Sequence, residues 1–160
     1  MFVRFDRLRD LRFSQLSQVY FQPLVDRCDQ HLLDNEQMFY QYLHDVFFKT
    51  ENAFYAVWLE AGEYVSALRL EPYKDGYLLA GLQTHCKLRK NGYAKSLVGA
   101  VIDNMKECNK YLKIYAHVKK DNVASIRVHE HCGFKKIADL AVYIDGSVAS
   151  DAYTFCYISE

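Results

Sequence analysis

The chain has 160 residues, of which 51% are hydrophobic, and its 20 basic side chains are balanced by 20 acidic ones. A chain of this length buries roughly two thirds of the surface that it exposes when unfolded, so we expect a single domain over residues 1–160. The absence of net charge gives no indication of a nucleic acid, an anionic membrane or a polyacidic molecule as partner.

The five cysteines are odd in number, widely spaced and contain no C-x-x-C pair. This pattern predicts neither a metal site nor a disulfide framework, and it fits a reducing cytoplasm. Residues 1–7 carry a charge at every second or third position, which is unlike a signal peptide or a membrane anchor. No apolar run reaches the ~18 residues of a membrane helix. We therefore expect a cytoplasmic protein without a metal ion.

The first third of the chain predicts one strand followed by two helices. Apolar and polar residues alternate over residues 2–7, as in a short strand with one buried face. Helical spacing then extends as far as Pro23, which should break or restart the helix, and it is carried by Leu11, Leu16, Val19 and Tyr20. Asp34 followed by Gln37 resembles a helix start, and an apolar stripe continues from there to Phe47.

The middle of the chain predicts three antiparallel strands, over residues 53–59, 64–70 and 77–84, which are joined by tight turns. Gly81 lies inside the third of these strands. A glycine weakens a strand unless a bulge or the close approach of a ligand requires it, and simple packing is the alternative role.

The remainder predicts two further helices and three further strands. They cover residues 94–108 (helix), 112–118 (strand), 122–132 (helix), 134–143 (strand) and 153–158 (strand), with a turn at Asp145 and Gly146. A strand, a helix and a strand in succession normally form a parallel pair with a right-handed connection. The fold class is therefore mixed α/β.

The loop after the third strand has the features of an anion-binding turn. Unpaired N–H groups in the first turn of a helix, and the positive end of its dipole, attract phosphate. Gly92 allows the main chain to approach a ligand, and the small Ala94 leaves that approach open. The basic residues around this turn are Lys87, Arg89, Lys90 and Lys95, and a solvated basic face is the alternative interpretation. A P-loop would need glycine where Ala94 precedes Lys95, so we set that motif aside.

Arg89, Gly92 and Ala94 have the spacing of motif A of the GNAT acetyltransferase superfamily, which this stretch resembles. A second stretch, residues 122–134, resembles the next motif of that family. Four of its five defined positions match, and they are Asn122, Ser125, Gly133 and Phe134. The fifth position, where the family usually has tyrosine, is occupied by His129. Offsets of three and seven residues place Asn122, Ser125 and His129 on one helix face.

The resemblance implies an α/β (α+β) fold with a mixed, mostly antiparallel sheet of about seven strands, flanked by about four helices. It also implies that acetyl-CoA binds between splayed strands. Its pyrophosphate would lie on the turn formed by Arg89, Lys90, Asn91, Gly92, Tyr93, Ala94 and Lys95. Its pantetheine arm would pair with the backbone of Leu82, Gln83 and Thr84, and Asn122 and Ser125 would face it.

For catalysis, the resemblance implies direct acetyl transfer to an amine in a ternary complex, with main-chain N–H groups near the bulge stabilising the oxyanion. The amine must first lose a proton, and Glu71 is the candidate base, with an exposed hairpin residue as the alternative. His129 is either the acid that protonates the departing thiolate or only a wall of the CoA cleft. His85 lies near the expected thioester position, or is simply a loop residue.

The acceptor pocket is expected around Pro23 and the hairpin at Tyr73, because loops on a rigid scaffold commonly set specificity. Phe21, Tyr73 and Tyr77 could form apolar walls, with core packing as the alternative for each. The competing function is an acyl-CoA-binding module without efficient turnover, which the missing tyrosine and the unassigned base favour. The identity of the amine stays open, as does the formation of a homodimer.

Overall fold

Residues 1–21 and 30–159 are described by a computed structural model, with side chains described for residues 1–21 and 34–159. The α-helices in these ranges are α1 (Phe13–Phe21), α2 (Gln30–Asp45), α3 (Tyr93–Cys108) and α4 (Val123–His131). The strands are β1 (Phe2–Phe5), β2 (Phe54–Glu60), β3 (Glu63–Tyr73), β4 (Gly76–Thr84), β5 (Lys113–Lys119), β6 (Lys135–Ala138), β7 (Ala141–Val142), β8 (Val148–Ala149) and β9 (Ala152–Ile158). Short 3-10 turns η1 (Leu8–Asp10), η3 (Phe47–Lys49) and η4 (Cys86–Leu88) lie between them.

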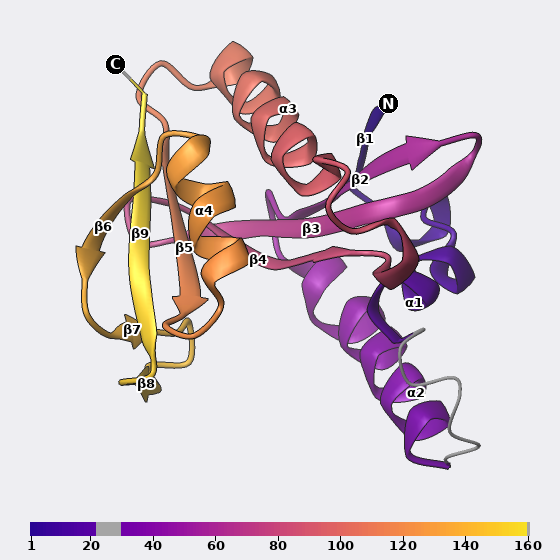
Figure 1. The fold of residues 1–160 in the computed structure, drawn as a ribbon. Helices are drawn as coiled ribbons and strands as arrows, with labels where there is room; N and C mark the ends of the chain where they lie inside the picture. Colours follow the sequence, from indigo (N-terminus) through magenta and orange to yellow (C-terminus); the bar gives the residue numbers. More distant parts are fainter. Residues whose placement is uncertain (22–29, 160) are drawn as a thin grey trace.

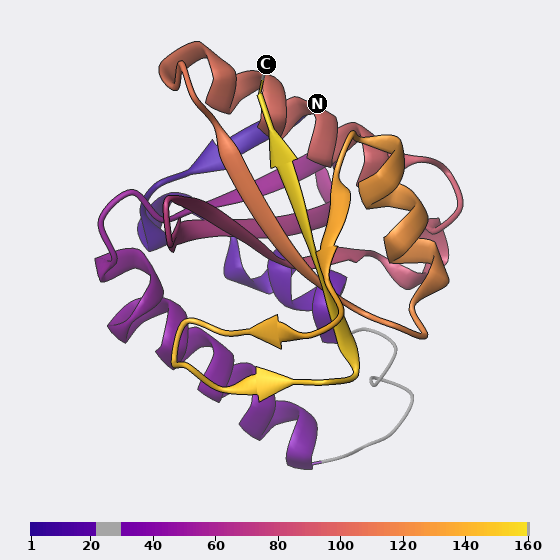
Figure 2. The same cartoon turned by 90° about the vertical axis from the view of Figure 1, so that its left-hand side faces the viewer.

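Seven strands form one sheet in the order β1-β2-β3-β4-β5-β9-β6, in which only β4 and β5 pair in parallel. This confirms the mixed, mostly antiparallel sheet and the predicted change from an antiparallel meander to a parallel pair. Helices α3 and α4 cover one face of the sheet, and α1 and α2 lie on the other (Figure 1). Figure 2, turned by 90°, shows the small β7–β8 hairpin, which extends from the lower end of β9. No helix of the described residues is both long and apolar enough to cross a membrane.

Each face of the sheet has its own core because successive side chains of a strand point to opposite faces. Leu68 and Leu70 of β3 pack toward α3, in a cluster that also contains Val98 and Val101. Ala67 of β3 instead belongs to the cluster that α1 and α2 cover. The periodicity of α3 places its buried residues on the sheet, as predicted, and they are Leu97, Val98, Val101, Ile102 and Met105.

The parallel contact between β4 and β5 is short. Its register runs from Tyr77 opposite Ile114 to Leu79 opposite Ala116, and the two strands pair no further. Beyond Leu79, β4 continues to Thr84 without β5 as a partner (Figure 1). A gap therefore opens between the two strands on the side where α3 begins.

A β-bulge occurs in β4 at the point where it leaves β5. Ala67 pairs with Gln83 and Arg69 with Ala80, so β4 contains one residue more than β3 between these two pairs. Gly81 lies in this bulge with φ of 62°, a conformation that favours glycine. A Cβ atom there would lie 2.9 Å from Nη1 of Arg69. The bulge interpretation of Gly81 is confirmed, and the reason for glycine is both conformational and steric.

Two predicted elements are wrong. The strand expected over residues 134–143 is divided: β6 ends at Ala138, and β7 pairs only with β8 in a separate sheet. The chain turns away between them, where the Thr154 hydroxyl donates to the Leu140 carbonyl. The helix start expected at Asp34 is also wrong, because α2 already runs from Gln30 and Asp34 is an exposed residue within it. Pro23 lies outside the described residues.

Candidate active site

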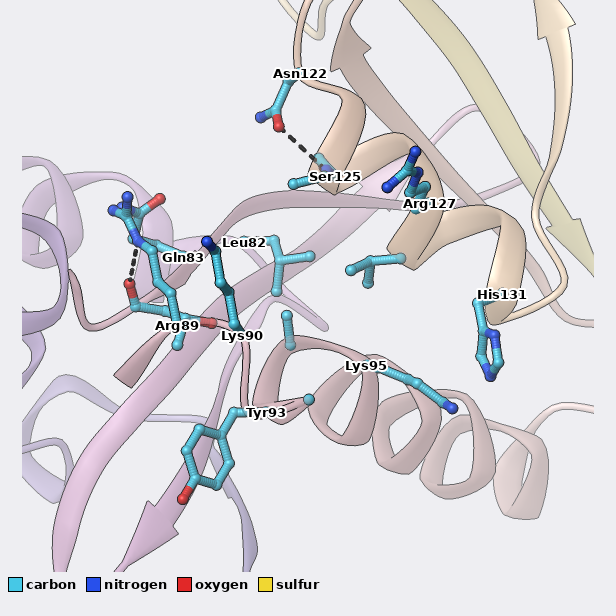
Figure 3. A pocket seen from close by; sticks show the side chains of 15 residues that line it. Leu82, Gln83, Arg89, Lys90, Tyr93, Lys95, Asn122, Ser125, Arg127 and His131 are labelled. Atoms are coloured by element: carbon cyan, nitrogen blue, oxygen red, sulfur yellow. Dashed lines mark hydrogen bonds between the residues drawn. The ribbon is translucent and has the colours of Figure 1, made fainter. Parts of the chain in front are cut away.

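A cavity of about 590 Å³ lies between the end of β4, the η4–α3 turn and α4 (Figure 3). Of the twelve residues predicted to bind the cofactor, eleven line it, all except Asn91. They are Leu82, Gln83, Thr84, Arg89, Lys90, Gly92, Tyr93, Ala94, Lys95, Asn122 and Ser125. The cavity is also lined by four α4 residues that the motifs did not indicate, namely Ala124, Arg127, Val128 and His131. Val128 and His131 could have been inferred from Ser125, because they continue its helix face in steps of three residues.

The turn before α3 has the form of an anion site. Gly92 caps the helix with φ of 81°, and no atom lies within 4 Å of the place where its Cβ would be. The Ser96 N–H donates to the Gly92 carbonyl at 3.0 Å, so the N–H groups that precede it have no acceptor within the helix. Asn91 turns the other way, and its Nδ2 donates to the carbonyl oxygens of Leu88 and Arg89 at 3.0 and 3.3 Å. Asn91 therefore shapes the loop instead of lining the cavity.

The charges around the cavity favour an anion. Arg89, Lys90, Lys95 and Arg127 line it, and none of the described residues that line it is acidic. Arg89 Nε also donates to the Thr84 carbonyl at 3.3 Å, a bond that ties the turn to the end of β4 (Figure 3). Cationic side chains near unpaired N–H groups form a suitable site for phosphate groups. The described residues contain no group of three or more side chains that could hold a metal ion.

Asn122 has two roles in α4. Its Oδ1 accepts a hydrogen bond of 3.1 Å from the Ser125 N–H, so it caps the helix as expected (Figure 3). Asn122 and Ser125 also line the cavity. Helix capping and contact with the cavity therefore coexist in the same residue.

His129 does not share that surface, and this corrects the prediction that it joins Asn122 and Ser125 on one ligand-facing side. Its side chain is only 2% exposed and contacts the rings of Phe134 and Phe155. Four residues along a helix correspond to about 400°, so His129 is rotated from Ser125 toward the sheet. The ring is therefore part of the core beneath α4 and not a wall of the cavity.

The protonation of His129 also opposes a role as general acid. Its Nδ1 lies 2.8 Å from the Ser125 carbonyl oxygen and must carry the proton, because a carbonyl only accepts. Burial holds the pKa of the imidazole below its usual value, so the ring is neutral and Nε2 carries no proton. Nε2 has no hydrogen-bond partner among the described residues. The structure thus gives His129 no free proton to donate to a thiolate.

Glu71 lies on the opposite face of the sheet from the cavity. It is part of β3, opposite Leu78, and not an exposed hairpin residue. Burial raises the pKa of its carboxyl, and the charge of Arg69 lowers it by a smaller amount. A half-buried carboxylate with a raised pKa is a suitable proton acceptor.

The other candidate residues have structural partners. Nδ1 of His85 accepts the Lys87 N–H at 3.3 Å, which caps η4, and His85 does not line the cavity. Tyr73 is buried against Tyr115 and donates to the Val142 carbonyl at 2.5 Å. Tyr77 packs with the α3-side core, on the other face of the sheet. Tyr73 and Tyr77 therefore do not form one wall, and Phe21 is partly buried against Phe39 of α2.

Comparison with known proteins decides the family. A sequence model described as the acetyltransferase (GNAT) family matches residues 11–134, a range that contains Glu71, the bulge, the turn and α4. The chain belongs to the GNAT acetyltransferase family. No curated protein matches this GNAT chain in sequence.

Solved structures share the GNAT fold at low sequence identity. Aminoglycoside 6'-acetyltransferase type Ii superposes with a TM-score of 0.70 at 15% identity, covering 98% of this chain and 96% of that one. An aminoglycoside 6'-N-acetyltransferase complexed with coenzyme A gives 0.64 at 15%, covering 99% and 96%. The ribosomal-protein-S18-alanine N-acetyltransferase from Escherichia coli gives 0.64 at 14%, covering 99% and 94%. At these identities the likeness establishes the fold and leaves the substrate undetermined.

Proposed function

We propose that this GNAT protein is an N-acetyltransferase that transfers the acetyl group of acetyl-CoA directly to an amine of a small molecule or peptide. The observation that carries the proposal is the cavity of about 590 Å³, whose basic turn and α4 wall adjoin the bulged end of β4. The phosphate site at one end of the cavity suits the pyrophosphate of CoA, and the unpaired backbone of β4 at the other end suits its pantetheine arm. A solved GNAT structure in complex with coenzyme A supports this choice of ligand.

Acetyl-CoA would bind along the surfaces that line the cavity. Its pyrophosphate would accept hydrogen bonds from the N–H groups of the turn from Arg89 to Lys95, beside the basic side chains. Its pantetheine amides would pair with the backbone of residues 82–84, where β4 no longer has β5 as a partner. The thioester would then lie at the bulge of Gly81.

The reaction requires one proton acceptor and one site for negative charge. Glu71, directly or through a water molecule, takes a proton from the ammonium form of the acceptor, and the free amine then attacks the thioester carbon. Main-chain N–H groups at the bulge stabilise the tetrahedral oxyanion. The C–S bond breaks, the nitrogen gives its second proton to solvent, and the CoA thiolate takes a proton from solvent, since His129 has none to give.

The two faces of the sheet would allow both substrates to be bound at once. The donor occupies the cavity on the α3–α4 side, and the acceptor approaches on the face that carries Glu71. None of the described cysteines lines the cavity, so no thiol is placed there for a covalent acyl-enzyme. Direct transfer in a ternary complex is therefore the mechanism that we propose.

The test is release of the CoA thiol from acetyl-CoA in the presence of a panel of amines, with acetyl-CoA binding measured separately by calorimetry. The proposal predicts both binding and amine-dependent release. Binding without release from any amine would indicate an acyl-CoA-binding module and would contradict the proposed activity. A lack of binding would contradict the CoA site itself.

A further inference from the structure

The face of the sheet opposite the CoA cavity carries a positive charge that no described carboxylate neutralises. Arg69 of β3 points toward α1 and α2, and its Nη1 lies beside Gly81 in the bulge. The side chain is only partly exposed, and its Nε has no hydrogen-bond partner. Among residues 1–21 and 34–159, the ion pairs do not include Arg69. Its guanidinium therefore lacks an ionic partner among the described residues, although it lies next to the expected thioester position.

Tyrosines surround this guanidinium without supplying negative charge. The Arg69 Cζ lies 5.6 Å from the centre of the Tyr42 ring, and Tyr20 and Tyr55 are the other two aromatic neighbours. Burial raises the pKa of all three phenols above the usual value. They stay neutral near pH 7, so Tyr42 and Tyr55 can accept hydrogen bonds from Arg69 but cannot balance its charge.

Glu71 is the acid that interacts with Arg69, two residues further along the same face of β3. It makes no ion pair with Arg69, and its own burial outweighs the attraction of the guanidinium. As the proposed base, it also becomes neutral when it takes the proton of the amine. Glu71 therefore cannot serve as the permanent counter-charge of Arg69 during the reaction.

A partly buried guanidinium without a counter-ion is costly, and the cost is recovered when an anion binds. Its planar fork of N–H donors matches a carboxylate in two-point contact. We propose that Arg69 binds a carboxylate of the acceptor, so that the preferred substrates are amino-carboxylates, such as amino acids, rather than polycationic amines. This inference rests on the proposed acetyl transfer. The amine would then lie between Arg69 and the bulge, near Glu71.

The experiment uses pairs of acceptors that differ only in the carboxylate, such as glycine with glycinamide and β-alanine with β-alaninamide. Thiol release is measured with acetyl-CoA, and kcat/KM is corrected for the fraction of free amine, because the two amino groups differ in pKa. We expect the acid of each pair to exceed its amide by about tenfold or more, the usual contribution of a charge-assisted contact. This comparison in the wild-type protein stands even where a variant does not fold.

Variants then locate the preference. Arg69→Met should reduce the acid-to-amide ratio to about one, and Arg69→Lys should keep part of it, since the charge remains and the fork is lost. Lys74→Met is the matched control. It removes a positive charge in the turn between β3 and β4, whose Nζ lies over the Tyr73 ring at 5.2 Å, so the ratio should not change. Calorimetry of CoA binding shows whether each variant keeps the donor site.

Each other outcome contradicts a separate statement. Turnover of acid and amide at equal rates, or a faster amide, would overturn this inference alone. A lack of thiol release with every acceptor would overturn the proposed function and this inference with it. A third arm pairs succinyl-CoA with glycinamide, because a carboxylate on the acyl chain could reach the same guanidinium. An Arg69-dependent gain confined to that arm would place the carboxylate on the donor and overturn the assignment to the acceptor.

Discussion

The hydroxyl of Tyr20 in α1 donates a hydrogen bond of 2.5 Å to the carbonyl oxygen of Gly81 in the β4 bulge. The Tyr55 hydroxyl donates in turn to Tyr20 at 3.1 Å. A bulge leaves backbone groups without partners in the sheet, and Tyr20 satisfies one of them. The direction of the peptide groups at the bulge therefore depends on a helix that is remote in sequence.

Tyr20→Phe should lower kcat for acetyl transfer by about fivefold, because the loss of one hydrogen bond of roughly 1 kcal/mol frees the bulge peptide to rotate. The affinity for CoA should change little, since Tyr20 does not line the cavity. Steady-state kinetics and calorimetry measure the two quantities. Tyr55→Phe is the comparison: it removes the hydrogen bonds of the Tyr55 hydroxyl to Tyr20 and Arg69 but keeps the bond between Tyr20 and Gly81, so it should cost less. Equal losses in the two variants would contradict a specific role for the bond to Gly81.

Gly92→Val should abolish detectable CoA binding while the protein stays folded. There is space for the side chain, but φ of 81° is strongly unfavourable for a β-branched residue, so the turn must change its backbone conformation. Gly146→Val is the control, because Gly146 has φ of 84°, equally open surroundings and a position far along the chain in the β7–β8 turn. Calorimetry should show normal binding in that variant. If the affinity of Gly92→Val for CoA is unchanged, the turn is not part of the CoA site.

Glu71→Gln should lower kcat by about 10²-fold, the usual contribution of a general base. In the wild-type protein, activity should rise with pH as the carboxyl loses its proton, at a pH above the ordinary value of 4.5. The variant should lack this rise, and Glu63→Gln, at the exposed start of β3, should retain it. A pH–rate profile of the three proteins provides the measurement.

The same shift predicts a gain in stability for Glu71→Gln. Because the folded state holds the proton more tightly than the unfolded state, the contribution of this group is present below pH 4.5 and lost as the pH rises through the folded pKa. The variant should therefore melt at a higher temperature than the wild type at pH 7, and not at pH 4. If Glu71→Gln is both slower and more stable than the wild type, its lower kcat cannot be due to misfolding.

His129→Phe should leave the pH profile of turnover unchanged, since the imidazole has no proton to give to the thiolate. Its effect should instead appear in stability. The depressed folded pKa means that the contribution of the neutral ring is present above pH 6.5 and is lost as the pH falls below that value. Between pH 7.5 and pH 5, the melting temperature of the variant should fall less than that of the wild-type protein. If kcat falls in His129→Phe and recovers in His129→Tyr, the residue at position 129 acts as the general acid and this prediction is wrong.

The features that the sequence predicted well depend on neighbouring residues. Gly92, Asn122 and Gly81 are required by backbone geometry at single points, so their types alone indicate the turn, the cap and the bulge. The core stripe of α3 was equally clear, because its apolar spacing repeats over about three turns.

The features that the sequence did not predict depend on contacts between residues that are distant along the chain. The path of residues 134–143 is set by Thr154 and by the Val142 carbonyl, which accepts hydrogen bonds from both Tyr73 and His117. The burial of His129 depends on Phe155, which lies on a later strand. Arg69 gave no signal of its own, since one arginine in a strand is ordinary until Tyr20 and Gly81 are brought beside it.

The short parallel contact between β4 and β5 leaves few backbone hydrogen bonds between the two halves of the sheet. Only three register pairs join them, from Tyr77 and Ile114 to Leu79 and Ala116, whereas β5 and β9 are paired over seven. Local opening has the lowest free energy where few backbone bonds must break. Amide protons along this junction should therefore exchange with deuterated solvent faster than those between β5 and β9. A CoA molecule that contacts both halves would slow that exchange. The exchange rate at the junction between β4 and β5 would therefore measure how much of the protein has CoA bound.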